Sequence, residues 1–101
     1  MNFFSLFLGF LLLCTEINAE QKVVLISGAT SGIGLSTAKA FQQRGWKVWA
    51  GYREKIPEEL NHLQNISFCR LDVTDEKLVR EAVEEILKKD GRIDALINNA
   101  G

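Results

Sequence analysis

Three glycines lie close together near the start of the chain, at Gly28, Gly32 and Gly34. They directly follow four apolar residues, 23–26, which predict a strand buried on both faces, and a helical pattern begins after them. A glycine turn between such a strand and a helix brings backbone N–H groups and the positive end of the helix dipole to one point, and the missing Cβ lets an anion approach closely. The spacing is Gly-x-x-x-Gly-x-Gly, not the commoner Gly-x-Gly-x-x-Gly, but the mechanical argument is the same. We therefore predict a site for a dinucleotide phosphate, against the alternative of a plain tight turn.

The hydrophobic pattern after this turn predicts alternating helices and strands. Continuous apolar runs predict strands at 47–52, 66–71 and 93–97. Helical patterns predict a helix over 33–44 and a short helix that has Pro57 at its first position and ends near Leu63. A third helix is predicted to be capped by Thr74 and to end at Gly91. Its first turn is predicted to hold Asp75 and Glu76. The apolar stripe of this last helix consists of Leu78, Val79, Ala82, Val83, Ile86 and Leu87.

The order of these elements is β-α-β-α-β-α-β, which predicts an α/β fold with a parallel sheet covered on both faces. We expect a Rossmann-type, doubly wound sheet in the spatial order 3-2-1-4, truncated after the fourth strand. Ligands of such sheets bind beyond the carboxyl ends of the strands, where the strand order reverses, here between the first and fourth strands. The segments 28–34 and 98–101 follow those two strands, so both are predicted to line one ligand crevice.

The composition is that of an ordinary globular protein of one domain at most. The net charge is -1 and the basic residues are scattered along the sequence, so nothing indicates a nucleic-acid partner. The two cysteines, Cys14 and Cys69, indicate neither a disulfide framework nor a metal site. The single histidine, His62, lies in a polar stretch and is expected to be solvated.

Residues 3–14 are nearly all apolar, and they divide the chain into an N-terminal segment, 1–21, and a partial dinucleotide-binding domain, 22–101. The run is short for a transmembrane helix and suits the hydrophobic region of a signal peptide, with Ala19 as a tolerable last residue before cleavage. The missing basic residue at the N-terminus and the bulky Ile17 count against a signal peptide. We expect export or membrane association through residues 3–14; a misassigned start codon, with a cytoplasmic protein, is the alternative.

Three sequences, in this order and at this spacing, give the chain a family resemblance. They are Ser-Gly-Ala-Thr-Ser-Gly-Ile-Gly at 27–34, Leu-Asp-Val-Thr at 71–74 and Asn-Asn-Ala-Gly at 98–101. With them the chain resembles the short-chain dehydrogenase/reductase family from Lys22 to Gly101. Ser27 is a conservative departure, because Thr is more usual there.

The resemblance implies an NAD(P)-dependent oxidoreductase that interconverts a carbonyl and a hydroxyl by hydride transfer, with a small substrate and a homo-oligomeric full-length parent. It implies that the glycine turn holds the pyrophosphate and the adenine ribose, through Gly28, Thr30, Ser31, Gly32, Ile33 and Gly34. It also implies that the Asp72 carboxylate accepts from the adenine amino group, that the Val73 backbone faces the ring, and that Asn99 lines the adenosine side. The alternatives are an Asp72 that serves only the approach to the next helix, and asparagines that serve only the strand end. Asn98 is expected to be structural, tying the fourth strand to its neighbour.

The choice of cofactor depends on the end of the second strand. An acid there binds the ribose 2′-hydroxyl of NAD, whereas a basic residue accommodates the 2′-phosphate of NADP. The strand ends in Tyr52-Arg53, and the guanidinium fork matches a phosphate in geometry and charge. NADP(H) is therefore favoured; Glu54 as a ribose partner, and with it NAD, is the alternative.

No residue of this chain is predicted to be catalytic. The family uses a Tyr with a Lys four residues later and a preceding Ser, but the one tyrosine here, Tyr52, is followed four residues later by Ile56. We expect a fragment that is inactive alone, with an apolar edge strand at 93–97 that makes it poorly soluble or partly molten. The alternative is a non-catalytic nucleotide-binding or interaction module, should the chain truly end at Gly101.

Overall fold

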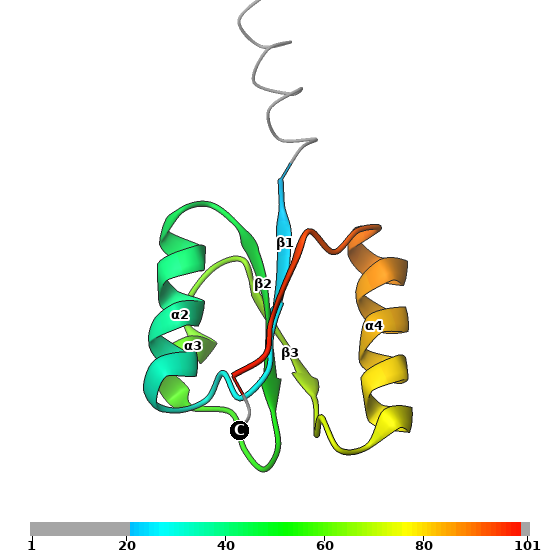
Figure 1. Cartoon of the computed structure of the whole chain (residues 1–101). Coiled ribbons are helices and arrows are strands. Elements are labelled where there is room, and N and C mark those ends of the chain that lie inside the picture. The colour runs from blue at the N-terminus through cyan, green and yellow to red at the C-terminus, as the bar shows by residue number, and fades with distance from the viewer. Residues whose placement is uncertain (1–20, 100–101) are drawn as a thin grey trace, which may run out of the picture.

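The computed structural model describes residues 21–99, which fold into a parallel sheet with helices on both faces (Figure 1). Most strand and helix positions predicted from the sequence are confirmed to within one or two residues. The elements follow in the order β1 (Val23–Ile26), α2 (Gly32–Gln43), β2 (Lys47–Tyr52), α3 (Glu58–Asn61), β3 (Ile66–Arg70), α4 (Glu76–Asp90) and β4 (Ala95–Ile97).

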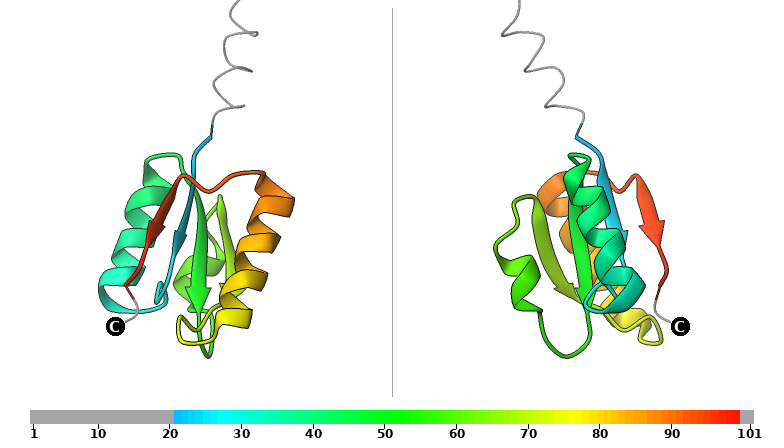
Figure 2. Two further views of the ribbon diagram at one scale, coloured as in Figure 1. Left: turned by 45° about the vertical axis from the view of Figure 1, so that its right-hand side comes forward. Right: turned by 90° about the vertical axis from the view of Figure 1, so that its left-hand side faces the viewer.

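The four strands lie in the spatial order β3-β2-β1-β4, and every neighbouring pair is parallel (Figure 2). The predicted order 3-2-1-4 and the predicted fold class are therefore confirmed. The carboxyl ends of β1 and β4 lie side by side, since Ile26 is the register partner of Ile97. The strand order reverses between these two strands, so the segments that follow them meet at one edge of the sheet.

The strands alternate their side chains between two apolar layers. Val24 and Ile26 of β1 join the layer under α2 and α3, whereas Val23 and Leu25 join the layer under α4. All four are at most 3% exposed, which explains why β1 is a continuous apolar run. Figure 1 shows the sheet nearly edge-on between these two layers.

The ends of two helices differ from the prediction. The first turn of α4 is capped by Asp75, whose carboxylate accepts from the backbone N–H groups of Lys77 (3.0 Å) and Leu78 (3.2 Å); the prediction of Thr74 as the cap is wrong. Pro57 is the N-cap of α3, with an extended backbone, and not its first helical residue. In each case the chain enters the helix one residue later than the sequence suggested.

One buried position and the start of the last strand also differ from the prediction. Leu87, predicted to lie in the buried stripe of α4, is 47% exposed, whereas Ala82 and Ile86 are buried as expected. The ladder of β4 begins only at Ala95. The preceding Asp94 accepts from the Val23 N–H through its carboxylate, and its own N–H donates to the Val23 carbonyl. Asp94 thereby marks the transition from the loop after α4 to the strand.

The hydrophobic run at 3–14, with Cys14 and Ala19, lies outside the described residues. Between residues 21 and 99, no helix is long and apolar enough to cross a bilayer.

Candidate functional site

The glycine turn after β1 uses each glycine for a physical reason. Gly28 and Gly32 have φ angles of 59° and 55°, in the left-handed region that side chains disfavour. Gly34 lies in the first turn of α2, where a Cβ would collide with the carbonyl oxygen of Gly28 and approach the side-chain nitrogen of Asn99 to 2.7 Å. Glycine therefore relieves backbone strain at Gly28 and Gly32, and at Gly34 it leaves the space that the turn needs to close over the end of β1.

The amino end of α2 is left without an acidic or side-chain cap. Its N-cap residue, Ser31, forms no side-chain cap hydrogen bond, and its first turn holds no acidic residue. At the corresponding end of α4, Asp75 caps the helix and Glu76 lies in the first turn. The amino end of α2 thus offers its N–H groups and dipole to an external anion. At α4, Asp75 accepts from two first-turn N–H groups and Glu76 adds a negative charge near the positive end of the dipole.

A set of hydrogen bonds centred on Ser27 joins the ends of β1 and β4. The backbone N–H of Ser27 donates to the carbonyl of Ile97 (2.9 Å), and its hydroxyl accepts from the N–H of Asn99 (2.9 Å) and donates to Oδ1 of Asn98 (3.0 Å). The side-chain nitrogen of Asn99 donates to the carbonyl of Gly28 (3.2 Å). We call these bonds between the ends of β1 and β4 the seam. The Ser27 hydroxyl is central to it, and Asn98 ties β4 to β1 as expected from the sequence.

A cavity of about 520 Å³ opens beside this seam, at the carboxyl ends of β1 and β2. Five of the predicted site residues line it, so the fold brings the glycine turn, the end of β2 and the end of β4 together. Its lining residues are Gly28, Thr30, Ser31, Arg53, Glu54, Lys55, Pro57 and Asn99.

A second cavity, of about 270 Å³, continues along the same edge of the sheet toward α4. Arg53 and Glu54 line both cavities, so the loop after β2 forms a shared wall between them. Asp72, predicted on the adenine side, lines the second cavity. Its other lining residues are Arg70, Leu71, Asp75 and Leu78.

Asp72 is held as a carboxylate in the approach to α4. Its Oδ1 accepts from the hydroxyl (2.7 Å) and the backbone N–H (3.0 Å) of Thr74. These two hydrogen bonds, helped by the charges of Arg53 and Arg70, lower the pKa of Asp72 below its ordinary value. The turn toward the helix therefore occupies one carboxylate oxygen, and Oδ2 takes no part in these two bonds.

Four predicted site residues line neither cavity. Gly32 and Ile33 are exposed at the start of α2, Gly34 is buried beneath the turn, and Val73 is 41% exposed beside Asp72. Ile33 is 76% exposed although it is a large aliphatic residue. Exposed apolar residues next to a cleft are available for contact with a ligand.

Sequence reasoning missed three residues of this edge. Lys55 and Arg70 line the cavities, and Gly51 is packed so tightly that a Cβ would lie 2.8 Å from the Leu71 side chain and 3.1 Å from the carbonyl of Ile26. The only signal for the two basic residues was their position at or just after the end of a strand.

Cys69 offers no reactive thiol. It is buried in β3, and burial, assisted by the charge of Glu85, raises the pKa of its thiol to about 11. In residues 21–99, no three His, Cys, Asp or Glu side chains are grouped to hold a metal ion.

Comparisons with known proteins point to one family. The chain is 39% identical over 84 residues to sulfoacetaldehyde reductase 2 of Chromohalobacter salexigens, a match that covers 78% of this chain and 33% of that protein. It is 43% identical over 88 residues to the 3-oxoacyl-(acyl-carrier-protein) reductase FabG of Thermotoga maritima, covering 81% and 36% of the two chains. The solved structure of ElxO with bound NADP matches with a TM-score of 0.72 and 42% identity, over 80% of this chain and 35% of that one.

The chain thus spans about a third of the length of the curated relatives it matches. The family model described as short chain dehydrogenase matches residues 22–101, which include the glycine turn, Asp72 and the Asn98–Asn99 seam. From this match and the sheet order that accompanies it, the chain belongs to the short-chain dehydrogenase/reductase family of oxidoreductases.

Proposed function

We propose that the chain is the cofactor-binding part of an oxidoreductase that uses NADP(H) to interconvert a carbonyl and a hydroxyl group. The observation that carries the proposal is the larger cavity, whose lining joins Thr30 and Ser31, directly before the amino end of α2, with Arg53 and Lys55 after β2. NADP carries a diphosphate, which suits the amino end of α2, and a separate 2′-phosphate, which suits the basic residues after β2.

Each residue of the proposed site has a defined task. The first-turn amides of α2, at Gly32, Ile33 and Gly34, bind the diphosphate, assisted by the hydroxyls of Thr30 and Ser31. Asn99 borders the adenosine side while it also fastens the turn through Gly28.

The adenine end belongs to the second cavity. Asp72 accepts from the adenine amino group through the oxygen that Thr74 leaves available, and the Val73 backbone faces the ring. The bound cofactor supplies the hydride, and this chain's residues bind and orient it.

The preference for NADP(H) over NAD(H) rests on the wall after β2. Arg53 and Lys55 place two cations beside the turn, and Glu54 places one carboxylate between them in sequence. A guanidinium can bind the 2′-phosphate through two parallel N–H donors, and hydrogen bonds to charged groups contribute about 1.5–3 kcal/mol each. ElxO, which is 42% identical, was solved with NADP bound.

The test is a fluorescence titration of the full chain with NADPH and NADH. We expect NADPH to bind at least about tenfold more tightly, because one charged hydrogen bond is worth that factor. Arg53→Ala is expected to reduce this preference and leave NADH binding unchanged, and Arg53→Ala/Lys55→Ala is expected to remove it. Arg44→Ala, an exposed arginine at the opposite edge of the sheet, serves as the matched control. Equal affinities of the wild-type chain for the two nucleotides would refute the proposed cofactor preference.

A non-catalytic nucleotide-binding module is the second candidate. Within residues 1–101, the one tyrosine, Tyr52, ends β2 and is followed four residues later by Ile56. Both candidates bind the cofactor, so binding does not separate them. The coding sequence beyond codon 101 distinguishes the two candidates. A reading frame that continues and encodes Tyr-x-x-x-Lys supports the enzyme, and a stop codon supports the non-catalytic module.

A further inference from the structure

Basic side chains that are scattered in the sequence gather at one edge of the fold. The amino ends of β1 and β2 and the carboxyl ends of α2 and α4 all lie at this edge, at the top of Figure 1. We call its six basic residues the basic edge: Lys22, Arg44, Lys47, Lys88, Lys89 and Arg92.

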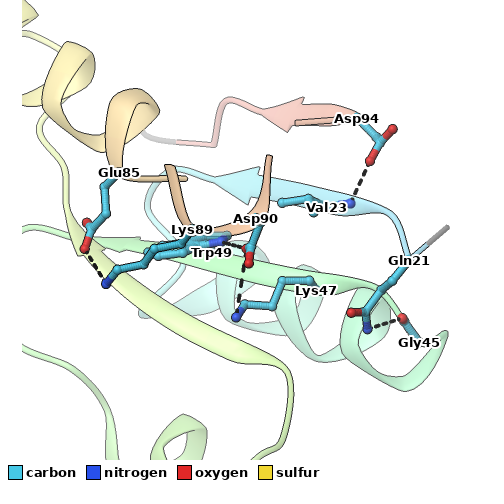
Figure 3. A network of polar contacts seen from close by, with 9 residues as sticks. All are labelled: Gln21, Val23, Gly45, Lys47, Trp49, Glu85, Lys89, Asp90 and Asp94. Atoms are coloured by element: carbon cyan, nitrogen blue, oxygen red, sulfur yellow. Dashed lines mark hydrogen bonds and ion pairs between the residues drawn. The ribbon is translucent and has the colours of Figure 1, made fainter. Parts of the chain in front are cut away.

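Contacts between distant segments hold this edge together (Figure 3). The side chain of Gln21 donates to the carbonyl of Gly45 (3.0 Å). The Lys22 ammonium lies 5.6 Å from the centre of a Trp46 ring. Val23 is fastened to Asp94 across the start of β1 by a hydrogen bond of 2.8 Å. The first described residues are thus tied to this edge.

The edge carries an excess of positive charge. Its three acidic neighbours each pair with one member: Asp90 with Lys47 at 3.9 Å, Asp94 with Arg92 at 2.6 Å and Glu85 with Lys89 at 2.9 Å. The other three members, Lys22, Arg44 and Lys88, are exposed and form no ion pair within residues 21–99. Among the other residues of 21–99, without the basic edge and its three acidic neighbours, eight are acidic and six are basic.

The apolar run at 3–14 ends only seven residues before Gln21, the residue that is fastened to the basic edge. A segment of this length is short for a transmembrane helix, so a basic patch beside it would add to its attraction for a membrane. Basic groups beside an anionic bilayer attract it, and partly exposed aromatics such as Trp46 suit the lipid interface.

We infer that the basic edge is a docking surface for an anionic lipid bilayer, which it contacts when residues 3–14 enter the membrane. The two signals lie at one end of the molecule and act together. The larger cavity, the proposed cofactor site, lies at the opposite edge of the sheet. The two edges are about 20 Å apart, because β2 has six residues and a strand rises ~3.3 Å per residue. This orientation leaves the cleft open to water and to a soluble nucleotide.

The test is a flotation assay on the full chain, synthesised cell-free in the presence of vesicles. The vesicles contain phosphatidylcholine alone or phosphatidylcholine with phosphatidylglycerol. The wild-type chain is expected to float better with the anionic vesicles, and high salt is expected to reduce the difference.

The variant Arg44→Gln/Lys88→Gln removes two charges that form no ion pair in the described structure. It is expected to lower partitioning onto anionic vesicles by about tenfold or more, because each basic residue near a membrane contributes about a factor of five. The matched control is Lys77→Gln/Arg80→Gln, which removes two exposed basic residues from the other half of α4 and is expected to change nothing.

Three outcomes would overturn the inference. They are equal flotation with neutral and anionic vesicles, an equal loss in the control variant, and binding to duplex DNA but not to vesicles that depends on Arg44 and Lys88. Because no cofactor is needed, a failure here leaves the proposed NADP(H) site untouched. Circular dichroism of both variants establishes that the fold is intact.

Discussion

Gly34, in the first turn of α2, lies directly against the carbonyl oxygen of Gly28, and the space between them admits no Cβ. The same Gly28 carbonyl accepts the hydrogen bond from the side chain of Asn99. The contact therefore links the turn, the first turn of α2 and the end of β4.

The first prediction compares two glycines of this turn. Gly34→Ala forces the turn away from the helix and is expected to abolish nucleotide binding. Gly32→Ala has open space around its Cβ and costs only the strain of a left-handed φ, about 1–2 kcal/mol. It is expected to weaken binding and not eliminate it. Fluorescence titration with NADPH measures both, with circular dichroism to separate loss of binding from loss of fold. Equal behaviour of the two variants would contradict the packing argument.

The second prediction concerns the buried Trp49 in β2. Its indole N–H donates to the carboxylate of Asp90 at the end of α4 (2.5 Å), and the ammonium groups of Lys47 and Lys89 lie within 6 Å of the ring (Figure 3). Trp49→Phe keeps an aromatic ring but removes this donor, so we expect a loss of about 1–3 kcal/mol in the free energy of unfolding. Pulse proteolysis in urea, which needs only dilute protein, measures it.

The control for this prediction is Trp46→Phe. The Trp46 ring packs edge-on against Phe41 at 4.9 Å, and its N–H makes no hydrogen bond within the described residues. Its replacement is expected to cost clearly less than that of Trp49. A larger loss at Trp46 would show that ring packing, and not the bond to Asp90, dominates.

The third prediction follows from the lowered pKa of Asp72. Because the folded pKa lies below the unfolded one, Asp72 contributes stability above the unfolded value, and this contribution is lost as the pH falls through the folded value. Thr74→Val removes the hydroxyl donor and is expected to raise the Asp72 pKa toward 3.8. Carbon-detected NMR of the carboxyl groups between about pH 6 and pH 2 measures this shift. Asp94, whose pKa is lowered by Arg92, serves as the internal control and is expected to keep its value.

The fourth prediction concerns the Cys69 thiol. A rise of its pKa from 9.0 to about 11 leaves about a hundredfold less thiolate at a given pH. In a Cys14→Ser background, the folded chain is therefore expected to react with iodoacetamide at least about a hundredfold more slowly than the chain in urea. Fast labelling without denaturant would show that β3 opens readily.

The fifth prediction addresses the edge strand β4, where Leu96 is 65% exposed. An apolar edge strand invites pairing with other chains, and a charged residue on it hinders this pairing. Leu96→Lys is expected to increase the soluble fraction of the chain after expression. Leu87→Lys, at a leucine that is 47% exposed on α4, is the control and is expected to help less. A larger gain at Leu87 would place the problem on the helix surface.

The continuous apolar runs and the glycines made the sheet predictable from the sequence. Val23–Ile26 is buried on both faces, and Gly45 and Gly91, with φ angles of 86° and 77°, lie just after the two long helices. The cap of α4 was not predictable, since Thr74 and Asp75 are both good capping residues. Which of them caps depends on the turn, in which the Thr74 hydroxyl is already used by Asp72.

By itself, the sequence determined the family, the sheet order and the glycine turn, because these depend on local residue types at a regular spacing. Only the tertiary structure decided which charged side chains meet. Lys55 and Arg70 line adjoining cavities, and six basic residues share one edge of the fold, because parallel strands bring distant segments to common ends. Such groupings depend on register and packing between segments, and no spacing along the chain encodes them.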